Sequence, residues 1–305
     1  MRVVDAHAHI FDVVAGIGAC GELRAIGNGR VRWANGDEMD MIPQGMGEDR
    51  FTADTLAKLL KENGVEKAVL LQGGLYGFQN DATQAAAQAY PDLFVASGTF
   101  DPFCLKSAEL ADRLIHKQKI SILKFELSSG VGLMSIHPKF DVDGDELADT
   151  ISMLEQVNGT LVLDIGCYGS PSYQPEAVAR ISMRHPGLRI VVCHLMAPGP
   201  KDGEHLRQSL ECLKRPNVWF DLSAIPWNIF PEQYPYPTGQ GFIRMAKEIV
   251  GSEKLLWGSD SPCVLTRDTY PRLMDYFAGA GIFTSSELDQ VMFQNAVTAY
   301  HLSVG

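Results

Sequence analysis

Short runs of β-branched and other apolar residues alternate along the chain with stretches whose apolar residues recur every three or four positions. The first pattern is typical of buried strands and the second of amphipathic helices. We predict strands at 2–11, 67–72, 93–100, 120–127, 160–166, 189–195, 218–224 and 255–260. Helices are predicted between them at 52–65, 109–118, 146–158, 175–186 and 241–251.

The segment 52–65, "TADTLAKLLKENGV", shows how a helix is recognised. Thr52 can cap the amino end with its hydroxyl oxygen, because the first backbone N–H groups of a helix lack partners. Leu56, Leu59 and Leu60 form one apolar stripe that can face a core. Gly64 can end the helix, because glycine adopts the left-handed conformation without steric penalty.

Strand–helix units repeated about eight times predict parallel strands joined by right-handed crossovers. Eight such units in 305 residues fit a (β/α)₈ barrel, and we expect residues 1–305 to form one barrel domain. A doubly wound open sheet is the competing fold. Its glycine-rich dinucleotide motif is absent after the first strand, which carries His-x-His instead, so the barrel is favoured.

The connection from about Asp12 to Arg50 interrupts this rhythm. It is rich in Gly, Asn, Met and charged residues and shows no clear periodicity. We therefore predict a long irregular first βα loop, unsuited to a core element but suited to cover the barrel mouth and select the substrate. A solvated insertion or a contact between identical copies is the alternative.

Composition excludes several classes of partner. The net charge of −11 argues against nucleic acid and anionic membranes, and no apolar run reaches the roughly 20 residues of a membrane helix. The six cysteines are scattered without a C-x-x-C pair, and a strand beginning near Arg2 leaves no room for a signal peptide. We expect a cytoplasmic protein whose partner is a small-molecule substrate; assembly into a homo-oligomer stays open.

The first strand carries "VVDAHAHIFD", in which His7 and His9 point to the same side together with Asp5. Two imidazoles on one face can hold a single cation. Hydrogen-bonded core histidines are the alternative for an isolated His-x-His.

Ionisable residues recur at the carboxyl ends of several other predicted strands, where a barrel would bring them to one mouth. They are Lys124, Glu126, Asp164, His194, Asp221 and Asp260. Because such groups are rarely buried without partners, a shared site explains them better than scattered core residues.

These segments resemble the amidohydrolase superfamily, in particular its amidohydrolase-related branch. That branch holds aminocarboxymuconate-semialdehyde-type decarboxylases and pyrone-dicarboxylate-type lactonases. The similar segments are "VDAHAHIF", "LLKENGVEKAVLLQ", "IVVCHLMAPGP", "PNVWFDLSA", "LLWGSDSP" and "QNAV", which together span nearly the whole chain.

The resemblance implies residue roles. His7 and His9 match the first-strand metal ligands, and Asp260 matches an eighth-strand aspartate that binds metal and accepts a proton from water. His194 matches a sixth-strand histidine that acts as acid or base. Metal-dependent relatives carry a fifth-strand histidine where this chain has Asp164, so Asp164 is expected as a substitute ligand. One zinc ion is favoured, with manganese as the alternative; operation without metal stays open, as in lactonase-like relatives.

Other residues are candidates for substrate binding. Lys124 is expected to pair with Glu126 or to bind a substrate carboxylate; a carboxylated bridging lysine is disfavoured without a fifth-strand histidine. Trp33 and Tyr76 are candidates for an aromatic pocket wall. Arg267, with Arg24, Arg30 and Arg32, is a candidate clamp for an anionic substrate, against ordinary exposed arginines as the alternative.

Three functions compete on this basis. A metal-dependent hydrolase would act by activated water on a small, carboxylate-bearing lactone or amide, and we favour it. A non-oxidative decarboxylase of a small aromatic or unsaturated acid would use the same groups to protonate carbon. A non-catalytic small-molecule binder would keep the pocket without needing Asp260.

Overall fold

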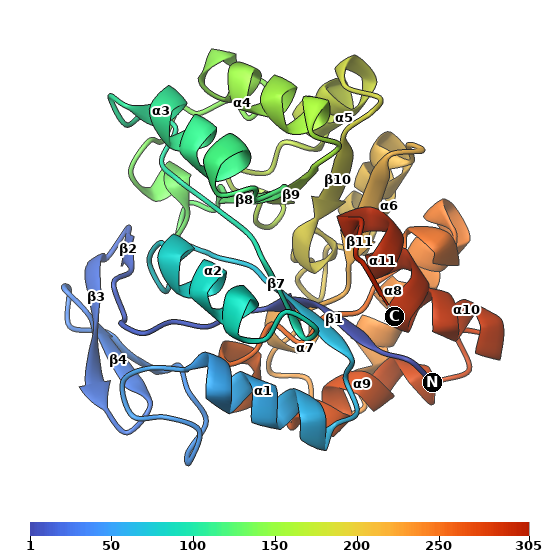
Figure 1. Ribbon diagram of the computed structural model, residues 1–305. Coiled ribbons are helices and arrows are strands. Elements are labelled where there is room, and N and C mark those ends of the chain that lie inside the picture. Colours follow the sequence, from blue (N-terminus) through green and yellow to red (C-terminus); the bar gives the residue numbers. More distant parts are fainter. Residues whose placement is uncertain (305) are drawn as a thin grey trace.

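Eight parallel strands form a closed barrel in the computed structural model, which describes residues 1–304 (Figure 1). The strands, in barrel order, are β1 (Val4–Ala8), β6 (Lys67–Leu70), β7 (Phe94–Ala96), β8 (Ile122–Glu126), β9 (Thr160–Asp164), β10 (Arg189–Val192), β11 (Val218–Asp221) and β12 (Leu255–Leu256). This confirms the predicted (β/α)₈ barrel, and each strand falls inside its predicted segment.

Continuous pairing holds the barrel in two arcs, β1-β6-β7 and β8-β9-β10-β11-β12. Parallel bridges join the arcs at Gly98 with Leu123 and at Ala8 with Ser261. The second seam continues past β12, because the backbone N–H of Asp260 donates to the His7 carbonyl at 2.8 Å. Closure therefore places Asp260 beside His9, which is 251 positions away in the chain, and near His7.

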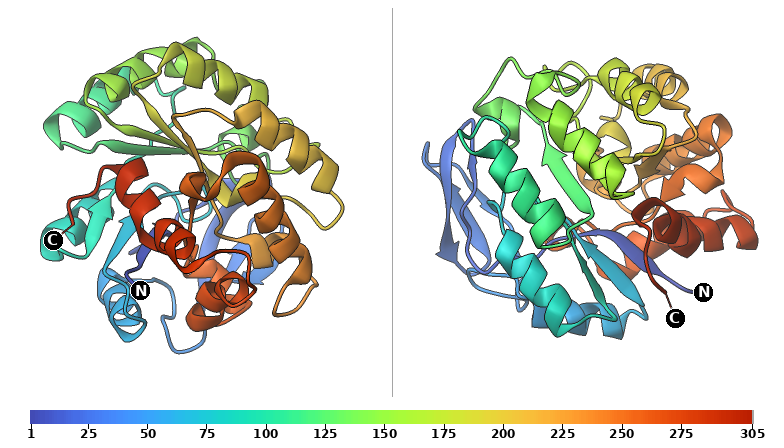
Figure 2. Two further views of the ribbon diagram at one scale, coloured as in Figure 1. Left: turned by 90° about the vertical axis from the view of Figure 1, so that its right-hand side faces the viewer. Right: turned by 45° about the horizontal axis from the view of Figure 1, so that its top comes forward.

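Helices surround the strands on the outside, except for the short α7, which lies at the barrel mouth (Figure 2). They are α1 (Ala53–Glu62), α2 (Asn80–Ala89), α3 (Ser107–Asp112), α4 (Asp145–Gln156), α5 (Pro175–Arg184), α6 (Gly203–Leu213), α7 (Ile225–Asn228), α8 (Pro237–Val250), α9 (Tyr270–Ala278), α10 (Ser285–Asp289) and α11 (Asn295–Tyr300). Across residues 1–304, no helix has the length and apolar character needed to cross a membrane.

Helix α1 forms as its sequence predicts. The Thr52 hydroxyl oxygen accepts the Thr55 N–H at 3.2 Å, and Leu56, Leu59 and Leu60 are buried. Gly64 follows the end of the helix with a φ of +68°. The cap, the apolar stripe and the terminator are thus all encoded locally.

The segment 12–50 is not the irregular loop that we predicted. It contains a four-stranded antiparallel sheet of β2 (Ile17–Gly18), β3 (Gly21–Gly27), β4 (Arg30–Trp33) and β5 (Glu38–Asp40), which lies at one edge of the molecule (blue in Figure 1). Asn28 and Gly29 turn the chain between β3 and β4 with φ values of +54° and +71°. Asn-Gly favours this kind of hairpin turn because both residues tolerate positive φ.

The prediction that this segment is unsuited to a core element is also wrong. Leu23, Val31 and Met41 are almost completely buried and belong to the main hydrophobic cluster. Burying each such side chain contributes roughly 1.5–3 kcal/mol relative to exposure. The sheet is therefore an integral part of the packed structure, and its removal would expose apolar surface.

Candidate active site

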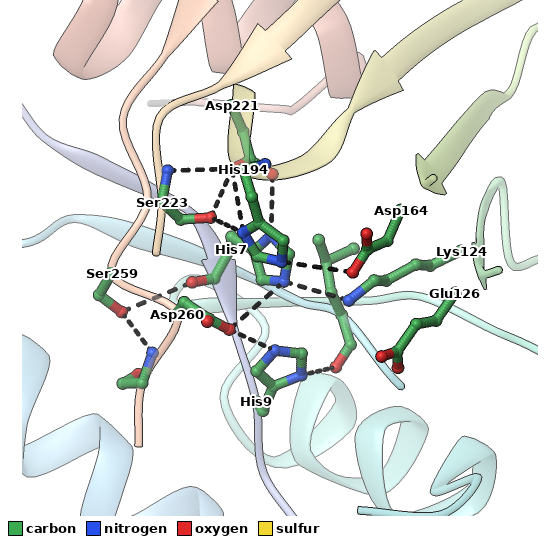
Figure 3. A network of polar contacts seen from close by, with 12 residues as sticks. His7, His9, Lys124, Glu126, Asp164, His194, Asp221, Ser223, Ser259 and Asp260 are labelled. Atoms are coloured by element: carbon green, nitrogen blue, oxygen red, sulfur yellow. Dashed lines mark hydrogen bonds and ion pairs between the residues drawn. The ribbon is translucent and has the colours of Figure 1, made fainter. Parts of the chain in front are cut away.

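A cavity of about 670 Å³ opens at the carboxyl ends of the barrel strands. Its lining includes most of the residues predicted for the site: His9, Lys124, Glu126, Asp164, His194 and Asp260. Figure 3 shows His7, His9, His194 and Asp260 gathered together, with Asp164, Lys124 and Glu126 along one side. Because each strand delivers its terminal residues to the same mouth, positions far apart in sequence meet here.

His7 is fixed by a buried carboxylate. Its Nδ1 lies 2.8 Å from Asp221 Oδ2, and both side chains are completely buried. Since a carboxylate only accepts, Nδ1 carries the proton and the Nε2 lone pair is left to face the site. Burial, assisted by the nearby Lys124 ammonium, lowers the pKa of His7 to about 4, so the imidazole is neutral at pH 7.

His9 is oriented in the same way by the backbone. Its Nδ1 donates to the Leu71 carbonyl at 2.9 Å, so its Nε2 is also an acceptor. That Nε2 lies 2.9 Å from Asp260 Oδ1. Two acceptors at this distance need a cation between them, either a proton or a metal ion.

Asp260 stands between the two first-strand histidines. Its Oδ1 is 2.9 Å from His9 Nε2 and 3.7 Å from His7 Nε2. Burial acts to raise the pKa of the Asp260 carboxyl, but the hydrogen bond with His9 and the charge of His194 outweigh it. The pKa lies well below its usual range, and the group is ionised.

His194 lies across the site on a turn after β10. Its ring stacks on that of His7 with centroids 4.7 Å apart, and its Nδ1 is 2.9 Å from Ser223 Oγ. Burial alone would lower the pKa of His194, but the carboxylates of Asp260, Asp164 and Asp221 raise it overall. A protonated imidazole is thereby favoured more than in water.

Lys124 and Asp164 lie on the neighbouring strands β8 and β9. Asp164 Oδ2 is 3.6 Å from His194 Nε2, and its Oδ1 accepts the Gly166 N–H at 2.9 Å. Lys124 Nζ lies 3.2 Å from His7 Nε2 and does not form a close ion pair with Glu126. Glu126 Oε2 instead accepts the Gly74 N–H at 2.6 Å.

The residues present fit a divalent cation. Ligand atoms of His7, His194 and Asp260 lie within 4.8 Å of one another, and His9 Nε2 lies 2.9 Å from the same Asp260 carboxylate. His7 of β1 and His9, which directly follows this strand, present Nε2 lone pairs beside an ionised carboxylate, which is the donor set that zinc and similar ions bind. Asp221, which fixes His7, is the outer partner that such ligands require.

Both predicted substrate-binding aromatics line the cavity, whereas none of the predicted arginines is among its lining residues. Trp33 from β4 and Tyr76 form part of the wall, and the Tyr76 ring packs 4.7 Å from that of His9. The Arg267 guanidinium lies over the rings of Trp227 and Phe230, 4.4 and 4.5 Å from their centroids. Arg267 as a direct substrate ligand stays a prediction.

Sequence reasoning noted Asp221 as a strand-end residue but gave it no role, and it missed Ser223. Asp221 Oδ2 orients His7, while Oδ1 accepts the backbone N–H groups of His194 and Ser223, each at 3.0 Å. The sequence signal that could have revealed the role of Asp221 is its position as a charged residue at the end of an otherwise apolar strand.

The turn that carries His194 is left-handed over four consecutive non-glycine residues. His194, Leu195, Met196 and Ala197 have φ values of +57°, +51°, +64° and +46°. Each such residue costs about 1–2 kcal/mol, and conformations of this kind concentrate at functional sites. The surrounding packing must therefore hold the turn that aims His194 at the cavity.

We expect Ala197→Gly to leave the free energy of unfolding unchanged or to raise it by up to about 1 kcal/mol, because glycine removes the left-handed penalty. Ala57→Gly, at an equally half-buried position inside α1, should lower it by about 1 kcal/mol. Urea unfolding of both variants measures the difference. Equal destabilisation by the two substitutions would show that the turn is not strained.

The structure is that of a (β/α)₈-barrel protein with a histidine–aspartate cluster at the barrel mouth. Comparison with known families shows which family of such barrels the chain belongs to. Residues 4–302 match the amidohydrolase family, so the chain belongs to that family. The comparison with curated proteins gave no match.

Solved structures share this fold at low sequence identity. A probable 2-pyrone-4,6-dicarboxylic acid hydrolase from Acinetobacter baumannii, with citric acid bound, is 18% identical with a TM-score of 0.69 over 99% of this chain and 100% of that one. An amidohydrolase from Burkholderia multivorans with bound zinc is 16% identical, with a TM-score of 0.73 over 99% and 100%. The 5-carboxyvanillate decarboxylase from Sphingomonas paucimobilis is 16% identical, with a TM-score of 0.59 over 81% of this chain and 81% of that one.

Proposed function

We propose that the protein is a metal-dependent hydrolase that opens a small lactone or amide with water. The observation that carries this proposal is the ionised Asp260 carboxylate, held 2.9 Å from His9 Nε2 at the cavity mouth. A carboxylate in that position can accept the proton of an attacking water and pass it to the leaving group.

His7, His9 and Asp260 would hold the cation, with Asp164 as the proposed fourth ligand. When bound, a divalent ion supplies Lewis acidity that lowers the pKa of water and polarises a carbonyl. We favour zinc, because imidazole and carboxylate ligands suit it and a structure of the same fold contains it. Manganese remains the alternative.

His194 is proposed as the acid or base on the other side of the substrate. Its raised pKa favours the protonated ring, which can donate a hydrogen bond to a carbonyl oxygen that gains negative charge. Ser223 and the left-handed turn hold the ring in place. Lys124 adds a second cation close to the site.

The same protonated His194 also supports a second candidate, a non-oxidative decarboxylase. There the ring would deliver its proton to carbon while carbon dioxide leaves. Trp33 and Met39 of the small sheet line the cavity and would restrict water. Release of carbon dioxide from an aromatic acid, without lactone hydrolysis, would establish this function in place of the first.

Protein purified without chelator is expected to contain about one zinc per chain and to lose lactone turnover on removal of the metal. Elemental analysis and activity before and after re-addition of zinc test this. His9→Gln should fail to retain metal, whereas His185→Gln, whose ring pairs with Glu155 at 2.7 Å, should retain it. Undiminished turnover of metal-free protein would overturn metal dependence.

A further inference from the structure

Large apolar side chains are exposed on the loops that follow four neighbouring barrel strands. β1, β6 and β7 pair in that order, and Gly98 after β7 bridges to Leu123 of β8, so the loops after these strands are neighbours. The exposed side chains are Val13 and Ile17 after β1, Phe78 after β6, Phe103 and Leu105 after β7, and Ile136 after β8. We call these six residues the rim patch.

Contacts between the loops make the rim patch continuous. The side chain of Gln79, next to Phe78, donates to the Val13 carbonyl at 3.0 Å. The Phe103 ring stacks on that of His137, which follows Ile136, with centroids 4.1 Å apart. All four loops also line one groove of about 150 Å³, whose walls include Ile17, Phe78 and Ile136. The patch is therefore a single surface with a groove in it.

Leu105 is the most exposed member of the patch, with 98% of its surface open to solvent. The turn that carries it is held by Asp101, whose Oδ1 accepts the Phe103 N–H at 2.9 Å and whose carbonyl accepts the Cys104 N–H at 3.1 Å. Leu105 is thus an apolar protrusion on a hydrogen-bonded turn. The same patch carries both this protrusion and the groove.

The apolar area of the rim patch matches what a stable dimer needs. At the exposed fractions found here, the six side chains together leave on the order of 500 Å² of apolar surface open to water. A specific interface buries about 800 Å² per partner, of which about 60% is apolar. Contiguous exposed apolar surface of this size is often an interaction site.

The two ends of the patch carry opposite charges. Asp12 is exposed beside Val13 at the β1 end, and Lys139 is exposed beyond Ile136 at the β8 end. Lys139 forms no hydrogen bond or ion pair within residues 1–304. A two-fold axis through the central groove would bring the β1 end of one copy to the β8 end of the other. Each aspartate would then face a lysine, which favours a second copy of this chain as the occupant.

We propose that the rim patch is the interface of a two-fold symmetric homodimer. Leu105 of each copy packs into the groove of the other copy, beside its Ile17 and Phe78. Asp12 of each copy faces Lys139 of the other. Because a two-fold interface uses the same surface on both copies, one patch must carry both the protrusion and the groove that receives it. The proposal concerns assembly and does not depend on the proposed reaction.

Analytical ultracentrifugation of the full chain should show a dimer at micromolar concentration. Leu105→Asp should raise the dimer dissociation constant at least a hundredfold, because it places a charge in an apolar groove. The fold should persist, since the exposed Leu105 side chain contributes little to the core, and circular dichroism checks this. A monomeric unmutated protein, or a folded Leu105→Asp variant that dimerises as tightly as the unmutated protein, would overturn the proposal.

Met183→Asp is the matched control for this substitution. Met183 on α5 is 60% exposed and lies outside the rim patch. Its replacement adds the same charge and should leave the dissociation constant within twofold of the unmutated value. Equal weakening by both substitutions would assign the effect to repulsion between chains of net charge −11, contradicting the proposal.

Charge reversal tests the two-fold arrangement. Lys139→Glu should weaken the dimer at least tenfold, because it places like charges opposite each other at both ends of the interface. Adding Asp12→Lys to the same chain restores opposite charges and should recover most of the lost affinity. A double variant that dimerises no better than Lys139→Glu would show that these two ends do not meet, which would overturn the proposed arrangement.

Discussion

Asp260→Asn is expected to lower kcat by about a thousandfold, because general base catalysis by a positioned carboxylate typically contributes 10²–10⁴. The asparagine amide cannot accept a proton from water, and it also removes the anion that His7 and His9 face at 3.7 and 2.9 Å. The loss should fall mainly on kcat, because the proton is transferred only in the transition state. Steady-state kinetics on the substrate identified by lactone screening measures it.

Asp268→Asn provides the matched control. Asp268 is also buried and follows the same strand, but it accepts from the Tyr236 hydroxyl at 2.7 Å and serves no role in the proposed chemistry. This variant should be less stable yet keep kcat near that of the unmutated protein. Turnover of Asp260→Asn within a few-fold of the unmutated protein would remove Asp260 from the mechanism and favour a binding function.

Asp221→Asn is expected to weaken zinc binding by about 10–100-fold, the usual cost of losing a second-layer partner. The backbone N–H groups of His194 and Ser223 will hold the amide oxygen where Asp221 Oδ1 now lies. The amide NH₂ must then face His7 Nδ1, which shifts the ring proton to Nε2 and removes the metal-binding lone pair.

Competition for zinc against a chromophoric chelator measures this effect separately from activity. Asp268→Asn again serves as the control, since it alters a buried aspartate outside the histidine cluster. A zinc affinity of Asp221→Asn that equals that of the control would show that the carboxylate does not set the tautomer of His7.

Much of the barrel was predictable because its signals are local. Segments such as "RIVVCHL" are apolar on both faces, as strands covered by helices must be. Thr52 and Gly64 bound α1 through hydrogen bonds and backbone freedom that involve only near neighbours in sequence. Ionisable residues at strand ends then predict a shared site once the barrel topology is accepted.

The small sheet escaped prediction for a physical reason. Along β3 only Leu23 is fully buried, so the two-residue alternation of a half-buried strand is weak. The Asn28-Gly29 pair is a sequence signal for a hairpin turn, but the many Gly, Asn and charged residues around it made the whole segment look irregular. What buries Leu23 and Met41 is tertiary packing, which the local pattern does not contain.

The detailed roles in the site also depend on tertiary contacts. Nothing local to His7 reveals that Asp221, 214 positions away, fixes its tautomer. The interpretation of Lys124 as a partner of Glu126 or a substrate carboxylate could not anticipate its position 3.2 Å from His7 Nε2. The pairing of Arg30 and Arg32 with Glu38 across adjacent strands is likewise a tertiary feature that the local sequence does not reveal.

The central claim is that this cluster activates water for attack on a carbonyl. Turnover of the lactone identified by screening in ¹⁸O-labelled water, followed by mass spectrometry of the product, tests it most directly. We predict a hydroxy acid that carries one ¹⁸O atom in its new carboxylate, with no release of carbon dioxide. A panel in which lactones and amides stay intact while an aromatic or unsaturated acid releases carbon dioxide would contradict the claim.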